Sequence, residues 1–155
     1  MDIDPGLLTF TILSIISIII ALVVIIKYNK KPYKTLTTLV GANIVLDLIA
    51  IAIWVLFPQF RWSIYNLDFV IVSIEAAVAS GLFAIVLIGL KKAKRWAPIV
   101  AIIITISQRV FTNYVFFLSI MNIITVVWSS LIIYFAYSVI KKSRALMHEE
   151  TLKGR

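Results

Sequence analysis

The sequence predicts an all-α integral membrane protein, a polytopic bundle of about five transmembrane helices with its N-terminus outside and its C-terminus cytoplasmic. First, 62% of the 155 residues are hydrophobic and the mean hydropathy is +1.06, whereas a soluble domain is roughly half apolar. Second, several apolar runs reach about 20 residues, the length that crosses about 30 Å of hydrocarbon as a helix. Third, clusters of lysine and arginine follow alternate runs, in agreement with the positive-inside rule.

The predicted spans follow the apolar runs in order. The acidic start and the full-length first run favour a transmembrane helix over a cleavable signal peptide. The second run closes at Pro58, and the third ends at a lysine cluster. Residues 96–140 are too long for one span, so we expect a break at residues 108–114 and a short fourth helix. A single domain, residues 1–155, is predicted, with spans at residues 7–26, 36–57, 67–90, 96–110 and 115–140.

The charge layout sets the predicted orientation. With five spans and an outside N-terminus, 13 of the 15 basic residues fall on the cytoplasmic side, in the segments 27–34, 91–95 and 141–155. Arg61 and Arg109 lie at or near the outer side. A four-span arrangement would place the last basic segment on the opposite side, against the positive-inside rule. We therefore expect a multi-pass protein of the cell (plasma) membrane.

The composition argues against several classes of function. Cysteine is absent, and the single histidine, His148, lies in the polar tail. Zinc and haem centres usually draw on several such ligands, so we expect no cofactor and no metal site. A net charge of +8 raises nucleic acid as a partner, but we expect none because topology accounts for the basic residues. No recognisable catalytic motif occurs, so we expect no enzyme activity.

Two polar side chains stand out in the second span. Asp47 lies about 18 Å along the helix axis from its cytoplasmic start, close to the bilayer midplane. An acid at that depth costs about 2.5–3.5 kcal/mol. Asn43 lies one helical turn earlier, on the same face. The pair is either part of an ion or proton path or a hydrogen-bonded element that fixes helix packing.

The remaining spans carry further polar groups. Glu75 and Arg109 have compatible depths, which predicts an ion pair that orients their helices; alternatively, Arg109 snorkels to the surface and Glu75 lines a polar cavity. The fifth span has a stripe suited to hydrogen bonds between helices or to an aqueous passage, formed by Ser119, Asn122, Thr125 and Ser129. The candidate interior cluster consists of Asn43, Asp47, Glu75, Arg109, Asn122 and Ser129.

Small residues recur at four-residue spacing on the third span. In lipid, small residues at this spacing let helix backbones approach closely. We therefore expect a tight helix contact on this span, with a partner helix from the same chain or from another. The residues form two rows, Ala76, Ser80 and Ala84 in the first and Ala77 and Gly81 in the second.

Three functional hypotheses follow. The first is a small non-catalytic integral membrane subunit of a larger membrane complex or homo-oligomer, whose partners are the lipid bilayer and other membrane subunits. Trp128 would then pack against another subunit, although lipid contact is the simpler expectation. The alternative is a small proton- or cation-coupled transporter or channel that uses Asp47 and Glu75. The third is recognition of an anionic membrane surface, to which each basic residue contributes about 1 kcal/mol.

Overall fold

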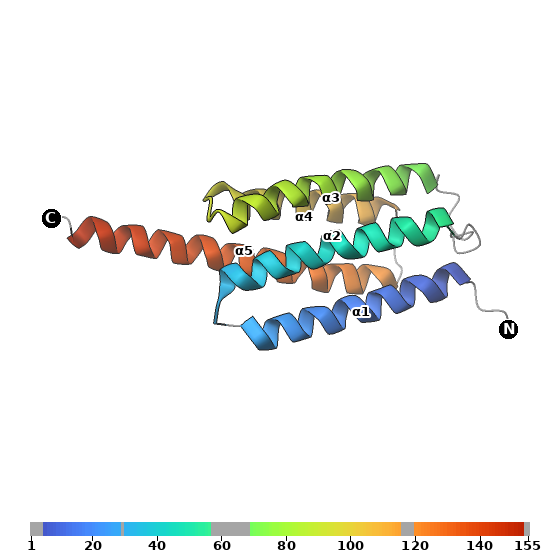
Figure 1. The fold of residues 1–155 in the computed structure, drawn as a ribbon, viewed down its shortest axis with the longest axis horizontal. Coiled ribbons are helices and arrows are strands. Elements are labelled where there is room, and N and C mark those ends of the chain that lie inside the picture. The colour runs from blue at the N-terminus through green and yellow to red at the C-terminus, as the bar shows by residue number, and fades with distance from the viewer. Residues whose placement is uncertain (1–4, 29, 57–68, 116–119, 154–155) are drawn as a thin grey trace.

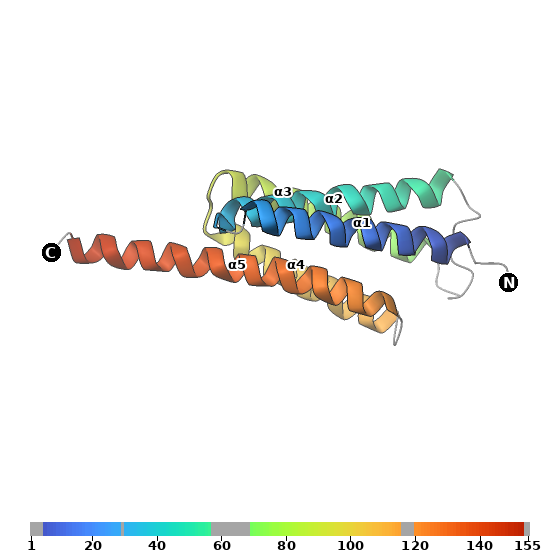
Figure 2. The same cartoon turned by 90° about the horizontal axis from the view of Figure 1, so that it is seen from below.

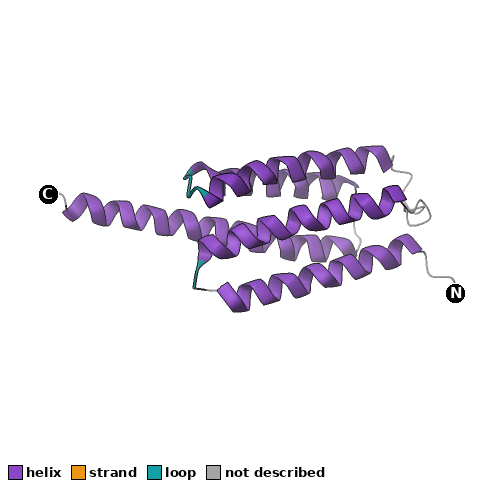
Figure 3. Cartoon of the chain, in the orientation of Figure 1, coloured by secondary structure: helices purple, strands orange, loops and turns teal. Residues whose placement is uncertain are grey.

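The computed structural model describes residues 5–28, 30–56, 69–115 and 120–153. Within these ranges the chain forms five α-helices and no strand, which confirms the predicted all-α class. Successive helices run up and down along one long axis, joined by short turns where the connections are described (Figures 1 and 3). Their bounds are α1 Pro5–Tyr28, α2 Pro32–Leu56, α3 Phe69–Lys91, α4 Trp96–Val115 and α5 Ile120–Lys153.

The helices form a bundle in which α2 occupies a central position. It packs against α1, α3 and α5, while α4 packs against α3 and α5. In Figure 2, α4 and α5 lie side by side, and their ribbons diverge from α1 and α2 toward the end that carries the N-terminus. At the opposite end, α5 continues well beyond the other helices. We call this opposite end, which holds the α1–α2 turn, the α3–α4 turn and the extension of α5, the basic end.

The fourth and fifth helices differ from the predicted spans. α4 continues to Val115, so a break at residues 108–114 and a helix end at residue 110 are wrong. Residues 99–115 contain no glycine or proline to end the helix, and Gln108 has a partner on α3, as described below. α5 begins at Ile120 and runs to Lys153, past the predicted limit of residue 140. Its polar tail is free of helix breakers and continues the same helix.

In the described part of the chain, two helical stretches, Pro32–Ile53 and Ile74–Lys91, are long and apolar enough to cross a membrane by length and composition. Within the described residues, Ile15–Tyr28 and Trp96–Phe111 are also apolar, but they are shorter. Membrane character is therefore supported by two helices. The arrangement of five spans with a fixed orientation is a proposal, which is developed below.

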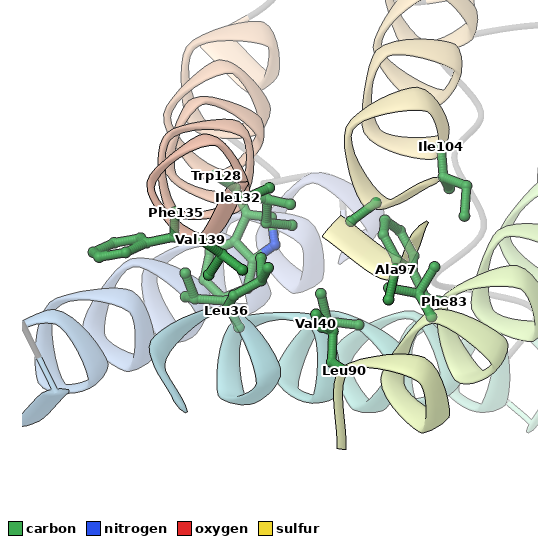
Figure 4. Close-up of a cluster of buried hydrophobic side chains, with 14 of the residues drawn as sticks. Leu36, Val40, Phe83, Leu90, Ala97, Ile104, Trp128, Ile132, Phe135 and Val139 are labelled. Atoms are coloured by element: carbon green, nitrogen blue, oxygen red, sulfur yellow. The ribbon is translucent and has the colours of Figure 1, made fainter. Parts of the chain in front are cut away.

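Among the residues whose side chains the structure describes, the hydrophobic core lies in the half of the bundle next to the basic end. Its buried side chains come from the C-terminal halves of α1 and α3, the N-terminal halves of α2 and α4, and the middle of α5. Figure 4 shows part of this core. The side chains that are almost fully buried include Leu36, Leu39, Val40, Phe83, Val86, Ile132 and Val139.

Trp128 belongs to this core, contrary to the expectation that it contacts lipid or another subunit. Only 9% of the residue is exposed, and it shares the inward face of α5 with Ile132, Phe135 and Val139 (Figure 4). Their spacing of three and four residues places all four on one side of the helix. The indole Nε1–H has no hydrogen-bond partner among the described residues.

The α1–α2 turn is closed by Thr35, which is fully buried. Its Oγ1 donates a hydrogen bond of 2.8 Å to the carbonyl of Tyr28, the last residue of α1. The backbone N–H of Lys31 donates to the same carbonyl at 2.7 Å. Pro32 opens α2 at a position where its missing N–H is not needed. These contacts fix the end of α1 against the first turn of α2.

The α3–α4 turn is a Schellman motif, a common way to end a helix. The N–H of Lys94 donates to the carbonyl of Gly89 at 2.9 Å, and that of Ala93 donates to the carbonyl of Leu90 at 3.0 Å. Ala93 has a φ of 50°, in the left-handed region that costs a non-glycine residue about 1–2 kcal/mol. The turn brings the start of α4 directly against the end of α3.

Gly89 makes this close approach possible. A Cβ atom added at Gly89 would lie 2.7 Å from Cη2 of Trp96 and 2.8 Å from Cβ of Ala97. By contrast, a Cβ atom added at Gly81 would meet nothing within 4 Å. Among the glycines that the structure describes, the tight helix contact is therefore at Gly89, near the end of α3, whereas the position of Gly81 is open.

We predict opposite effects for two glycine-to-alanine substitutions on α3. Gly89→Ala is expected to lower the free energy of unfolding by about 1–3 kcal/mol, because the added methyl overpacks the α3–α4 contact. Gly81→Ala is the matched control. It is expected to be neutral or to raise stability by up to about 1 kcal/mol, since alanine favours a helix over glycine. Reversible unfolding in mild detergent micelles measures both; similar losses at the two positions would contradict the α3–α4 packing.

Candidate functional site

The carboxyl group of Asp47, half-buried on α2, accepts hydrogen bonds from two side chains. Nδ2 of Asn43 donates to Oδ2 at 2.9 Å, because residues four apart share one face of a helix. Oγ of Ser80, on α3, donates to the same oxygen at 3.4 Å. That distance is long for an O–H···O bond, so the Asn43 contact is the stronger. The Ser80 contact links α2 to α3.

Ser80 differs from the other hydroxyl groups whose bonds are described inside the helices. Apart from Thr35, whose hydroxyl closes the α1–α2 turn, those groups donate to the carbonyl four residues earlier in their own helix, which satisfies them without any tertiary contact. Ser80 is only 5% exposed, yet its hydroxyl reaches a neighbouring helix. Its contact with Asp47 is therefore specific to this pair of helices. The hydroxyls that bond within their own helix are those of Thr37, Thr38, Thr105 and Ser138.

Glu75 extends the polar region from α3 to α4. Its carboxyl group, half-buried on α3, is hydrogen-bonded to the side chain of Gln108 on α4. A negative charge on Glu75 also acts on the carboxyl group of Asp47. Three helices therefore contribute to one polar cluster, which we define as Asn43, Asp47, Glu75, Ser80 and Gln108.

The other predicted members of the interior site are placed as follows. Arg109 is half-buried on α4, next to Gln108; its ion pair with Glu75 stays a prediction. Ser129 is half-buried on α5, directly after Trp128. Asn122 lies in α5, but its side chain falls outside the described part of the structure. The structure thus brings together Asn43, Asp47 and Glu75, and the participation of α5 in the cluster stays a prediction.

The two rows of small residues on α3 have different surroundings. In the first row, Ser80 is buried and both Ala76 and Ala84 are half-buried. In the second row, Ala77 and Gly81 are exposed. The first row therefore faces the bundle and includes a hydroxyl of the polar cluster. The second row forms an exposed strip of low bulk on the outside of α3.

Two members of the polar cluster were missed as polar partners from the sequence. The residue spacing predicts Ser80 only as a small packing residue, and the length of the apolar run predicts Gln108 only as the start of a helix break. The sequence does hold a signal for such polar partners, since each of the two is an uncharged polar residue within an apolar run. Their partners depend on how α2, α3 and α4 are rotated about their axes. That rotation is set by tertiary packing.

The polar cluster has two chemical capabilities. Two carboxyl groups flanked by amide and hydroxyl groups offer oxygen ligands that suit a proton or a hard cation. The same groups can also hold three helices in register through hydrogen bonds. Among the described residues, no group of three histidine, cysteine or carboxylate side chains comes together. Among the described residues of the cluster, the oxygen atoms available to a cation therefore belong to two carboxylates, one serine hydroxyl and two side-chain amides.

A double-mutant cycle tests the contact between Asp47 and Ser80. We expect Asp47→Ala and Ser80→Ala to be coupled by about 0.6 kcal/mol in the free energy of unfolding, with an upper bound of about 1.7 kcal/mol. The control cycle combines Asp47→Ala with Thr105→Val. Its coupling should be close to zero, because Thr105 donates to Ala101 of its own helix. Equal coupling in both cycles would show that the Ser80 contact is not specific.

No protein-family model matches the sequence, and no curated protein or solved structure is significantly similar to it. The assignment of a function therefore rests on the side chains of this chain and their geometry. Within the described residues, the polar cluster and the lysine-rich basic end are two regions where polar or charged side chains from distant parts of the sequence come together.

Proposed function

We propose that this chain is a small, non-catalytic, multi-pass membrane protein that acts as a subunit of a membrane complex or of a homo-oligomer. In this proposal all five helices cross the plasma membrane. The N-terminus is outside, and the basic end faces the cytoplasm. The polar cluster holds α2, α3 and α4 in register inside the bundle.

The apolar outer surface is the observation that carries this proposal. Large hydrophobic side chains are exposed on every helix, and soluble monomers rarely expose contiguous apolar patches of more than a few hundred Å². Lipid chains offer these side chains an apolar environment that water cannot. Representative exposed residues, one for each helix in order, are Ile19, Val45, Ile85, Ile103 and Val127.

The distribution of charge supports the proposed orientation. Both described turns and the segment where α5 leaves the bundle lie at the basic end (Figure 1). Exposed lysine and arginine side chains gather there, as expected for a cytoplasmic side under the positive-inside rule. The two carboxyl groups of the polar cluster lie further along α2 and α3, away from this end. The exposed basic residues of this end are Lys27, Lys30, Lys31, Lys34, Lys91, Lys92, Lys94, Arg95, Lys141, Lys142 and Arg144.

The exposed strip of Ala77 and Gly81 supports assembly with another helix. Nothing lies within 4 Å of a Cβ atom placed at Gly81, so this part of α3 is open to an approaching backbone. In membranes, helices associate through such small residues, because van der Waals packing replaces the hydrophobic effect. A second copy of this chain or another membrane protein can therefore pack there more closely than elsewhere on α3.

A coupled transporter is the second candidate, and one observation favours it. Asp47 and Glu75 lie close enough for the charge of one to act on the other. Intramembrane acidic groups of this kind are found along the proton and ion paths of transporters. Alternating access usually places the site between structural repeats, so this function would require several copies of a five-helix chain.

The subunit proposal predicts that mild-detergent extraction from the native membrane yields the chain together with further copies or with reproducible companion proteins. Gly81→Leu is expected to release it as a monomer, because the added side chain fills the exposed strip. Ala52→Leu adds the same bulk to an exposed position on α2 and should leave the assembly intact. Native mass spectrometry reports the masses. A lone monomer for the unmodified chain would refute the proposal.

The two candidate functions are separated by a flux measurement in proteoliposomes. The subunit proposal predicts no proton or cation flux above that of empty vesicles, either for the natural chain or for Asp47→Asn. A flux that is present in the natural chain, absent in Asp47→Asn and retained in Thr105→Val would instead establish the transporter. Thr105→Val serves as control because it alters a buried hydroxyl that bonds only within α4.

A further inference from the structure

An open pocket of about 430 Å³ lies at the basic end, between the start of α2, the α3–α4 turn and α5. Four lysines line it, Lys30, Lys31 and Lys34 near the start of α2 and Lys142 on α5. Its volume is within the range of about 300–1,000 Å³ that is typical of small-molecule sites. The fold therefore joins two basic segments that lie far apart in the sequence.

The pocket carries a positive charge that its own lining does not neutralise. None of the described residues that line it is acidic. The ammonium group of Lys34 lies 4.7 Å from the ring centroid of Tyr28, a cation–π contact that fixes its position. Lys30, Lys31 and Lys142 are exposed. Like charges at close range repel each other, so an anion between these ammonium groups would lower the electrostatic energy of the folded chain.

Other groups around the pocket also suit an anion. α2 begins at Pro32, which lines the pocket. The first turn of a helix has N–H groups without intrahelical partners and carries the positive end of the helix dipole. Tyr33 and Ser143, each of which carries a hydroxyl group, line the pocket as well. The lysines, the helix N-terminus and these hydroxyl-bearing residues thus come from the α1–α2 turn, α2 and α5, and they point to one class of ligand.

We propose that this pocket binds a phosphate group, carried either by the headgroup of an anionic lipid or by a soluble phosphate compound. Lysine binds phosphate as a point charge, and several lysines can surround one tetrahedral anion. Val139 and Leu146 give the pocket an apolar wall, which suits the glycerol and upper acyl part of a lipid. The lipid form of this inference rests on the proposed membrane embedding, but not on the subunit role.

The test uses two triple variants of the full chain. The pocket variant carries Lys30→Gln, Lys31→Gln and Lys142→Gln. The control variant carries Lys91→Gln, Lys92→Gln and Lys94→Gln, three exposed lysines of the same end that do not line the pocket. Each protein is reconstituted in phosphatidylcholine nanodiscs that contain a trace of phosphatidylglycerol, and bound lipid is counted by native mass spectrometry. In a second arm, delipidated protein in neutral detergent is titrated with inorganic pyrophosphate.

We expect the pocket variant to lose at least about tenfold in affinity for the phosphate-bearing ligand, and the control variant at most about twofold to threefold. A loss of affinity by the pocket variant in the phosphatidylglycerol arm assigns the site to a lipid headgroup. Loss in the pyrophosphate arm alone assigns it to a soluble phosphate compound. Equal losses in both variants, or no binding in either arm, would overturn the site. Resistance of the protein to alkaline extraction from pure phosphatidylcholine vesicles tests membrane embedding separately.

Discussion

A carboxyl group in the middle of an apolar helix is the constraint on which the rest of this structure depends. Asp47 cannot be left without polar partners in a low-dielectric surrounding, because an unpaired buried polar group is costly. Asn43 supplies one partner from the same helix, and Ser80 supplies another from α3. Glu75 and Gln108 continue the polar contacts to α4. The rotation of three helices is thereby coupled to the position of one acid.

Different interactions are described in the two halves of the bundle. The hydrophobic core fills the half next to the basic end, where Thr35 closes the α1–α2 turn and Gly89 allows α4 to approach α3. The polar cluster lies further from the basic end along α2, α3 and α4. Among the described side chains, apolar packing predominates next to the basic end, and side-chain hydrogen bonds link α2, α3 and α4 further along the bundle.

The sequence was sufficient to predict what depends on local properties and insufficient for what depends on helix rotation. Apolar runs and basic clusters predicted the five helices of the described residues and the approximate ends of the first three, and spacing placed Asn43 and Asp47 on one face. Helix rotation decided the rest. The rotation of each helix about its axis places Trp128 in the core, brings Glu75 next to Gln108, and leaves open space at Gly81. Lys142 meets the lysines of the α1–α2 turn only through packing of α2 against α5, which no local pattern encodes.

The proposed membrane embedding requires the exposed side of α3 to face lipid and Asp47 to be shielded by protein. The natural absence of cysteine allows single spin labels to be placed at Val78→Cys, on the exposed side of α3, and at Asp47→Cys in reconstituted bilayers. The measurement is the accessibility of each label to oxygen, which partitions into lipid, and to a water-soluble nickel complex. We expect Val78→Cys to be accessible to oxygen and not to nickel, and Asp47→Cys to be protected from both. Exposure of the Asp47→Cys label to oxygen at the level of Val78→Cys, or access of nickel to Val78→Cys, would contradict the account.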